Sequence, residues 1–506
     1  MSSSHHAVEE TTMEVGPEEP DPGLTRRLRS GLIWLYVSKY TGKLIFFGAT
    51  LILARLLTPD DFALVAFALA ILGLAEAADL GVGAALVWLD REKAMKSRSV
   101  VFTLNNISIL LLSIAFWFLA PPIADILSDD PNATWVFRAL IPVLLLRALG
   151  LTHENLLKRE MDFRKRFLPE FCGGIVKGVL AVVLALSGFG VWALVGGVIA
   201  GQAVRTTGLW IVVPFRPRFD LGLDGRAKVL ITYGANVSFI ALLTYVAGIV
   251  DYFLVGSLLG ATVLGFYVIA YRIPEIVLEE GLQTASQALF PYYSRSREAG
   301  ESASERFLGT TKISALIATP IVAILAGMAT PIIVIYFGGK WEPAAEALPG
   351  LAISAALLTI SGFAGDMYLA LGKPWLQWVL GVPSLIVLIA GLWFVAPEGI
   401  AAIAWFLVVF AVVESVIKWD IVCRITDTRR RAIAASLLPA VLTGIPTALA
   451  AVAISQTTPA VFAALAGPVI VLLVFAVACV IFVPEASGYL KRLRDWAPLA
   501  RRQGAA

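Results

Sequence analysis

Residues 34–87 read WLYVSKYTGKLIFFGATLILARLLTPDDFALVAFALAILGLAEAADLGVGAALV, and this stretch decides the fold. It consists of two apolar runs separated by the turn-forming sequence Thr-Pro-Asp-Asp at residues 58–61. A turn between two apolar runs of about 18 residues or more is typical of a transmembrane helical hairpin. The hairpin also carries Lys39, Lys43, Glu76 and Asp79 where lipid hydrocarbon should surround the chain. Ionisable groups at such depth usually face a bundle interior or a water-filled path, so these four are candidates for function.

The composition extends this interpretation to the whole chain. Of the 506 residues, 58% are hydrophobic and 15% are charged, and the mean hydropathy is +0.82. Charged residues make up about a quarter of soluble domains, so we expect a polytopic membrane protein. The three cysteines and three histidines are scattered, and no nucleotide-binding loop or hydrolase motif is present. The sequence therefore predicts no metal site, no cofactor and no enzyme activity, and nothing in it indicates nucleic-acid binding.

Apolar runs of about 18 to 27 residues predict about fourteen membrane spans in an all-α integral membrane protein. Their expected limits are 31–57, 62–88, 100–120, 134–152, 168–187, 190–213, 229–252, 261–289, 310–336, 346–371, 375–396, 400–422, 433–455 and 460–483.

The distribution of basic residues predicts the orientation of these spans, because Lys and Arg are retained on the cytoplasmic side. Basic residues cluster in every second connection and in the C-terminal tail, namely at 91–98, 158–166, 216–228, 295–306, 373, 424–431 and 491–502. Near the opposite face only Arg55 and Lys340 occur. Both termini are therefore expected in the cytoplasm.

A weak internal repeat predicts two related bundles. LLTPDDFALVAFA at residues 56–68 aligns without gaps on LLGATVLGFYVIA at residues 258–270, six predicted spans later. An even number of spans per copy gives parallel repeats related by a pseudo-two-fold axis along the membrane normal. A chance match between Leu- and Ala-rich helices is the alternative. The predicted organisation is an acidic tail (1–24), two six-helix bundles (25–220 and 221–430), two further helices (431–485) and a basic tail (486–506).

Positive charges converge at one depth of the first bundle. At about 1.5 Å per residue, Lys39, Lys177 and Arg205 lie roughly 12 to 14 Å from the cytoplasmic ends of their spans, level with Asp79. Such a layer favours a water-filled cavity with a cationic wall for an anionic, phosphate-bearing ligand. The alternatives are snorkelling to the headgroups or structural ion pairs. The complete predicted cationic set is Lys39, Lys43, Arg138, Arg147, Lys177, Arg205 and Arg272.

Several carboxylates are candidates for ion coupling. Glu76 and Asp79 are three residues apart and so share one helix face, where they could hold a proton or pair with the lysines of the first span. Asp366 has no charged residue within four positions along the chain. Glu414 stands four residues before Lys418 and is expected to pair with it. The predicted ion-coupling set is Glu76, Asp79, Asp366 and Glu414.

Three stretches resemble a known family. The run LARLLTPDDFALVAFALAILGLAEAADLGVGAALV, the segment LVGSLLGATVLGFYVIAYRIPE with the later LFPYYSR, and FGGKWEPA at residues 337–344 are similar to bacterial lipid-linked oligosaccharide flippases. These form the polysaccharide transporter family of the MOP superfamily, and the likeness to its colanic-acid-exporter-like branch covers about residues 25–485. One departure is Ala63, where the family usually has Gly.

The resemblance implies an alternating-access carrier of MOP-type fold that moves an undecaprenyl-diphosphate-linked glycan across the membrane. It also implies membrane lipid as surroundings and a polysaccharide polymerase and a chain-length regulator as partners, and we expect a monomer. A multidrug or organic-cation antiporter of the same superfamily is one alternative, although its cavity should be acidic. A membrane-embedded polysaccharide polymerase is the other, although the expected large external loop is absent from the sequence.

Overall fold

The chain is known from a computed structural model that describes residues 47–77, 81–83, 86, 89, 91–127, 131–160, 163–279, 289, 293, 302–373 and 375–483. Every regular element among these residues is helical. A helix Phe47–Leu56 is followed by α2 (Pro59–Ala77), α4 (Arg91–Leu127), α5 (Pro131–Arg159), α6 (Phe163–Leu186), α7 (Val191–Val212), α8 (Arg226–Leu259), α9 (Ala261–Pro274) and the π-turn η1 (Glu275–Glu279). The second half contains α11 (Ala303–Gly327), α12 (Ala329–Ile332), η2 (Ile333–Phe337), η3 (Gly339–Glu346), α13 (Leu348–Ala370), α14 (Trp375–Val395), η4 (Ala396–Glu398), α15 (Ile400–Ile425), α16 (Arg430–Thr457), α17 (Ala460–Leu465) and α18 (Gly467–Phe482).

Where the structure describes them, the predicted spans overlap helices or helix pairs in this order. Of the described helices, ten are long and apolar enough to cross a membrane, and Phe47–Leu56 and Gly467–Phe482 are shorter apolar helices. A multi-pass, all-helical membrane protein is therefore confirmed, while the count of fourteen stays a prediction. The proposed tails and much of the first predicted span lie outside the described residues.

The predicted loops on either side of the third span are wrong. Residues 91–98 and 121–127 belong to α4, which is 37 residues long. A basic segment can continue a helix beyond the bilayer when its charges reach water, and the Lys96 ammonium lies 2.6 Å from the Glu92 carboxylate one turn earlier. The basic cluster at residues 91–98 therefore did not mark the end of the helix.

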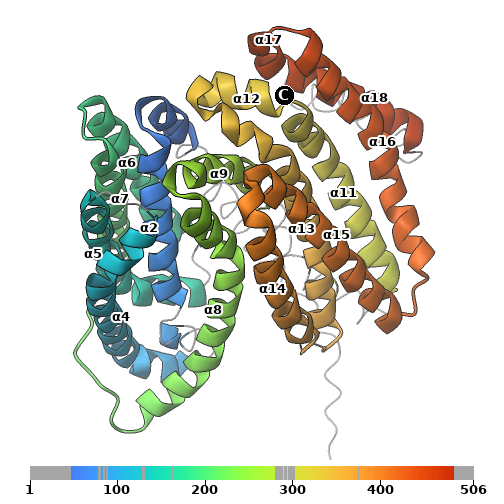
Figure 1. The fold of residues 1–506 in the computed structure, drawn as a ribbon. Coiled ribbons are helices and arrows are strands. Elements are labelled where there is room, and N and C mark those ends of the chain that lie inside the picture. Colours follow the sequence, from blue (N-terminus) through green and yellow to red (C-terminus); the bar gives the residue numbers. More distant parts are fainter. Residues whose placement is uncertain are drawn as a thin grey trace, which may run out of the picture.

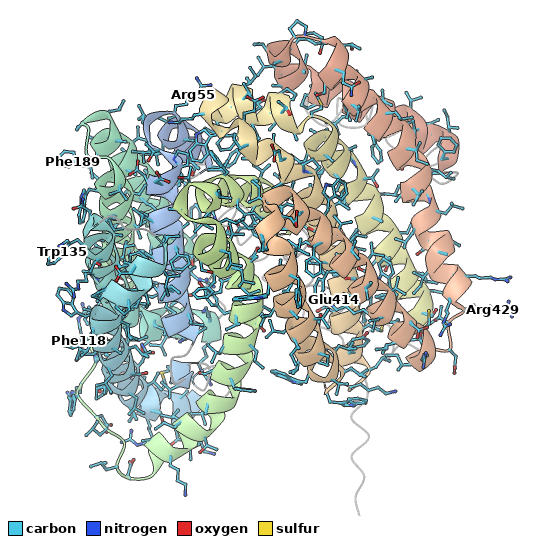
Figure 2. All side chains as sticks on the ribbon, in the orientation of Figure 1. Arg55, Phe118, Trp135, Phe189, Glu414 and Arg429 are labelled. Atoms are coloured by element: carbon cyan, nitrogen blue, oxygen red, sulfur yellow. The ribbon has the colours of Figure 1, made fainter. Side chains whose placement is uncertain are left out.

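The helices form two bundles that stand side by side (Figure 1). The first contains α2 and α4 to α7, and the second contains α11, α13, α15 and α16 with α18 on its outer side. Helix α8 packs on α2 and α4 along one side and on α14 along the other, so it joins the bundles. Large apolar side chains such as Phe118, Trp135 and Phe189 point away from the first bundle (Figure 2) and are 72%, 55% and 55% exposed. Outward apolar faces of this kind suit contact with lipid.

The two stretches that the predicted repeat aligns lie against each other in the structure. Helix α2 begins at Pro59 and α9 begins at Ala261, which are equivalent positions of the repeat. The two helices pack on each other, and the Thr262 hydroxyl donates a hydrogen bond of 2.6 Å to the carboxylate of Asp60, its own counterpart in the alignment. A Cβ at Gly265 would lie 2.2 Å from the Pro59 carbonyl oxygen, so only glycine permits this approach. Contact between equivalent positions places the pseudo-two-fold axis close to this point.

The end of the molecule that the charge pattern predicts to be external is closed. The Trp341 indole is fully buried, and its N–H donates a hydrogen bond of 2.7 Å to the Ala54 carbonyl. Its ring meets the Phe62 ring edge-on at 5.3 Å. Lys340 donates to the carbonyls of Arg55 and Leu57, and the Arg55 guanidinium donates to a carbonyl of η2. Because these bonds join the helix Phe47–Leu56 to η2 and η3, we call them the external clasp.

Candidate functional site

A cavity of 510 Å³ lies between the first bundle and helices α8 and α9, beneath the external clasp. Thr50 and Leu53 of the helix Phe47–Leu56, together with α2, α6 and α7, form its first wall, and α8, α9 and η1 form the opposite wall. One wall belongs to the first bundle, and α8, α9 and η1 of the opposite wall pack on α13 and α14. A movement of the second bundle relative to the first would therefore change the shape of the cavity and the access to it.

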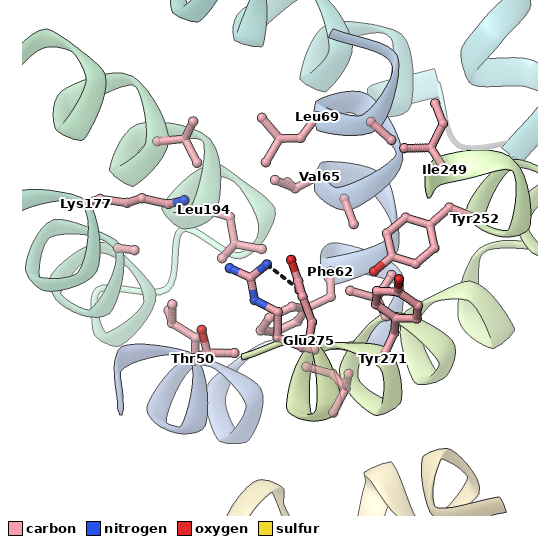
Figure 3. A pocket seen from close by; sticks show the side chains of 18 of the residues that line it. Thr50, Phe62, Val65, Leu69, Lys177, Leu194, Ile249, Tyr252, Tyr271 and Glu275 are labelled. Atoms are coloured by element: carbon pink, nitrogen blue, oxygen red, sulfur yellow. Dashed lines mark hydrogen bonds and ion pairs between the residues drawn. The ribbon is translucent and has the colours of Figure 1, made fainter. Parts of the chain in front are cut away.

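Two of the predicted cations, Lys177 and Arg272, line this cavity. Lys177 is on α6, which packs very closely on α7, since a Cβ at Gly201 would stand 2.6 Å from the Lys177 Cβ. Figure 3 shows the Lys177 side chain extending from α6 into the cavity, with Glu275 and its ion pair facing it. The cavity therefore presents an ammonium on one wall and a guanidinium on the other.

Arg272 and Glu275 are at the junction of α9 and η1, where Pro274 lacks the backbone N–H that a regular helix would use. The Arg272 guanidinium lies 3.0 Å from the Glu275 carboxylate, and both side chains remain partly exposed. An ion pair of this kind can open to a ligand, because an anion can replace the carboxylate as partner of the guanidinium. Glu275 did not belong to the predicted sites, although its spacing of three from Arg272 is a local signal for the pair.

Tyrosines form the rest of the polar lining. Tyr245, Tyr252 and Tyr271 contribute to the cavity, and the Tyr252 and Tyr271 rings meet edge-on at 5.6 Å. The Tyr245 hydroxyl donates to the Ala70 carbonyl and thus ties α8 to α2. Rings that carry hydroxyl groups can pack on the apolar faces of sugars and bind their hydroxyls. Sequence reasoning missed these residues because tyrosine in a membrane helix is usually assigned to packing or to the interface.

Arg205 of α7 is outside the cavity lining and belongs to a charge network with α5 and α6. Its guanidinium lies 2.7 Å from Glu154 and 3.5 Å from Glu170. Glu154 is 6% exposed and also pairs with Lys158 at 2.9 Å and with Arg166 at 3.2 Å. The network joins α5, α6 and α7, so it fixes these three helices relative to one another.

Arg147 and Arg138 both lie on α5, outside the cavity lining. The Arg147 guanidinium is 2.6 Å from the Glu76 carboxylate of α2. Arg138 stacks over the rings of Trp117 and Trp135, at 4.8 and 5.3 Å from their centroids. Those tryptophans are 42% and 55% exposed on the outward face, so Arg138 lies where the snorkelling alternative expects it.

The remaining candidates are distributed over the chain. Glu414 and Lys418 form the ion pair expected from their spacing, at 2.6 Å, on α15 of the second bundle (Figure 2). Asp366 is partly buried on α13. Lys39, Lys43 and Asp79 lie outside the described residues. Within the described part of the chain, no group of three or more His, Cys, Asp or Glu side chains could hold a metal ion.

Asp251 was expected from the sequence only as a membrane-level charge, and its surroundings set it apart. Asp251 of α8 is 7% exposed and accepts a hydrogen bond of 2.7 Å from the Tyr267 hydroxyl of α9. A sequence signal was available, because Asp251 is the only charged residue between Lys228 and Arg272.

Comparisons with known proteins agree with the fold described above. A family model described as polysaccharide biosynthesis protein matches residues 52–346. The chain is 28% identical over 327 residues to the succinoglycan biosynthesis transport protein ExoT of Rhizobium meliloti, covering 64% of this chain and 66% of ExoT, which is just under two thirds of its length. It is 24% identical over 410 residues to the teichuronic acid biosynthesis protein TuaB of Bacillus subtilis, covering 79% of this chain and 83% of TuaB.

Two solved structures share the fold at low sequence identity. The lipid II flippase MurJ in an inward closed conformation superposes with a TM-score of 0.71 at 13% identity, covering 90% of this chain and 99% of MurJ. An inward-facing multidrug resistance MATE family transporter of the MOP superfamily gives a TM-score of 0.61 at 15% identity, covering 79% of this chain and 99% of the transporter. This chain therefore shares the two-bundle arrangement of these two proteins.

Proposed function

We propose that this chain, which belongs to the polysaccharide biosynthesis protein family of the MOP superfamily, is a flippase for lipid-linked oligosaccharides. Its substrate would be an undecaprenyl-diphosphate-linked repeat unit that moves from the inner to the outer leaflet by alternating access, for exopolysaccharide, O-antigen or capsule synthesis. Relatives described as transport and biosynthesis proteins for succinoglycan and teichuronic acid support this class of substrate.

The observation that carries the proposal is the pair of cations that line the cavity. Lys177 and Arg272 approach one space from opposite walls, which suits the two phosphates of a diphosphate. Guanidinium and ammonium groups bind phosphate through charge-assisted hydrogen bonds. The tyrosines on α8 and α9 would then contact the glycan, while the polyprenyl chain stays in the lipid.

The other predicted cations have different parts in this proposal. Arg147 and Arg205, which pair with carboxylates of neighbouring helices, stabilise the first bundle. Lys39 and Lys43 remain proposed as further phosphate ligands on the first span. We further propose a location in the bacterial cytoplasmic membrane with both termini inside, a monomer, and cooperation with a polysaccharide polymerase and a chain-length regulator.

The test is flipping of a fluorescent undecaprenyl-diphosphate oligosaccharide in proteoliposomes, read from its accessibility to an impermeant quencher. We expect the double variant Lys177→Ala, Arg272→Ala to flip at least about tenfold more slowly, because each charge-assisted hydrogen bond contributes about 1.5 to 3 kcal/mol. Arg138→Ala is the matched control, since it removes a membrane-level arginine from outside the cavity lining. Equal rates in the double variant and the wild type would contradict the proposed role of the cavity.

Transport of organic cations is the rival activity, since a MATE family transporter shares the fold. Two cations on the cavity walls oppose the binding of a cationic drug by charge repulsion. Proteoliposomes that accumulate an organic cation but leave the lipid-linked glycan in place would favour this rival.

A further inference from the structure

The carboxyl of Asp251 on α8 is buried. Its oxygens accept two hydrogen bonds, one of 2.7 Å from the Tyr267 hydroxyl and one of 2.9 Å from the Tyr252 backbone N–H. Within the described part of the chain, Asp251 forms no ion pair with a lysine or arginine. A buried carboxylate without a counter-charge is costly, and such a group usually binds a proton instead.

Other membrane-level carboxylates differ in this respect. Glu76 pairs with Arg147, Glu154 with Arg205, and Glu414 with Lys418, each at 2.6 or 2.7 Å. Each of these three carboxylates has a cation as its partner. Asp251 instead accepts hydrogen bonds only from uncharged donors.

The charged groups on the elements packed against α8 leave the neutral form favoured. Helix α2 contributes Glu76, which is already paired, and in its first turn Asp60 and Asp61, which accept hydrogen bonds from Thr262 and Thr58. Asp125 of α4 and Glu398 of η4 are exposed to solvent, and α14 contains no charged residue. Helix α9 and η1 contribute Tyr267 and Tyr271 and the cavity ion pair of Arg272 and Glu275.

The surroundings also connect Asp251 to the conformation of the protein. Its partner Tyr267 is completely buried and touches the rings of Tyr252 and Tyr271, which line the cavity. Tyr267 is on α9, the helix whose Thr262 and Gly265 pack on α2 at the closed external end. Ionisation of Asp251 in this arrangement would place a negative charge without a cationic partner in the buried contact between α8 and α9. Helix α9 is also the helix that packs on α2 at the closed external end.

We propose that Asp251, hydrogen-bonded to Tyr267, is the proton-carrying residue that couples transport to a pH gradient. This rests on the proposed flippase function. When the external end is open, the carboxylate takes one proton from the outside, and the neutral acid allows the end to close. The proton leaves toward the cytoplasm when the next anionic substrate enters, so one proton moves inward for each substrate that moves outward.

A gradient experiment in proteoliposomes tests the coupling. The membrane potential is clamped to zero, the interior is buffered, and the exterior is made one pH unit more acidic. For one coupled proton we expect the outer-to-inner leaflet ratio of the fluorescent lipid-linked oligosaccharide to rise about tenfold in wild-type protein. Asp251→Asn, which mimics the neutral acid, should still exchange substrate between leaflets but show no such rise. A tenfold rise in Asp251→Asn would overturn the proposal.

Two controls separate coupling from structural damage. Glu414→Gln removes a paired membrane-level carboxylate and should keep the full response to the gradient; loss of the response there, with Asp251→Asn unaffected, would assign the proton to Glu414 instead. Tyr267→Phe keeps the carboxyl but removes its donor, and it should shift the pH at which the exchange rate changes. An unchanged pH profile in Tyr267→Phe would contradict the role of the pair.

Infrared spectroscopy of the purified protein provides a readout that does not depend on flipping. A protonated carboxyl has a C=O stretching band that an ionised carboxylate lacks. We expect one such band to grow as the pH is lowered, to be absent in Asp251→Asn and to move in Tyr267→Phe. Identical spectra of wild type and Asp251→Asn in this region would refute the inference. If the wild type does not flip the glycan, the proposed function fails, and the band still decides the protonation of Asp251.

Discussion

Substitution of Trp341 by Phe should open the external end of the protein. The indole N–H of Trp341 donates to the Ala54 carbonyl across the two bundles at 2.7 Å, and the indole is fully buried. Phe keeps an aromatic ring against Phe62 but cannot donate this hydrogen bond, so the carbonyl loses a partner when the end closes. Leaving one buried acceptor unsatisfied costs about 1 to 3 kcal/mol.

The size of the shift follows from this cost. A loss of about 2 kcal/mol changes the ratio of closed to open protein about thirtyfold. If the closed form has a population of about 99%, its open counterpart would rise from about 1% to about 23%. Such a change is measurable, whereas the loss of one exposed hydrogen bond would not be.

Double electron–electron resonance between spin labels measures this population. Labels at Leu56→Cys and Val461→Cys suit the purpose, because both positions are exposed and lie near the groove that Arg55 and Val461 line at the external end. We expect a second, longer distance in Trp341→Phe. Trp393→Phe makes the same change at a ring that is 57% exposed on α14 and serves as the control. An unchanged distance distribution in Trp341→Phe, or an equal shift in both variants, would refute the reasoning.

Three further outcomes are expected. Glu154→Gln should lower the thermal unfolding midpoint in detergent by several degrees, since removing one partner of a buried ion pair costs about 3 to 5 kcal/mol; Glu92→Gln, at an exposed pair, should leave the midpoint unchanged. Gly265→Val should separate α9 from α2 and slow flipping while leaving membrane insertion intact, which cross-linking and flipping rates would report. A hydrogen bond from Arg226 holds the pKa of Asp224 below its ordinary value of 3.8, so the hydrogen-exchange protection factors in the 220–226 connection should stay constant from pH 7 to 5 and fall only as the pH falls through that lowered pKa. Lower protection factors already at pH 5 would show that this contact does not hold the connection.

Much of the fold was predictable because the bilayer imposes a length and a polarity on each span. The repeat alignment also placed the starts of α2 and α9 at equivalent positions, as Pro59 and Ala261 confirm. The ends of α4 were not predictable, since a helix can leave the membrane without changing its backbone hydrogen bonds. Hydropathy reports the surroundings of a segment, and the backbone conformation can continue beyond them.

The candidate site was predictable only in part, because depth along a helix does not determine the direction in which a side chain points. Lys177 and Arg205 were expected at one level, yet Lys177 lines the cavity while Arg205 contacts Glu154, 51 residues away in the chain. The pair of Glu414 and Lys418 was visible in the sequence because it is local. Partners from other helices, such as Tyr267 for Asp251, become visible only when the helices are packed.

The hydrogen bond between Thr262 and Asp60 also bears on how a duplicated bundle can diverge. In a dimer of two identical bundles, one residue would have to meet itself at this point, and two aspartates would place like charges about as close as the 2.6 Å that now separates hydroxyl from carboxylate. An acceptor on one copy and a donor on the other removes that conflict. When both copies are in one chain, the two equivalent positions can carry different residues. The donor Thr262 and the acceptor Asp60 then form a hydrogen bond that two identical bundles could not form.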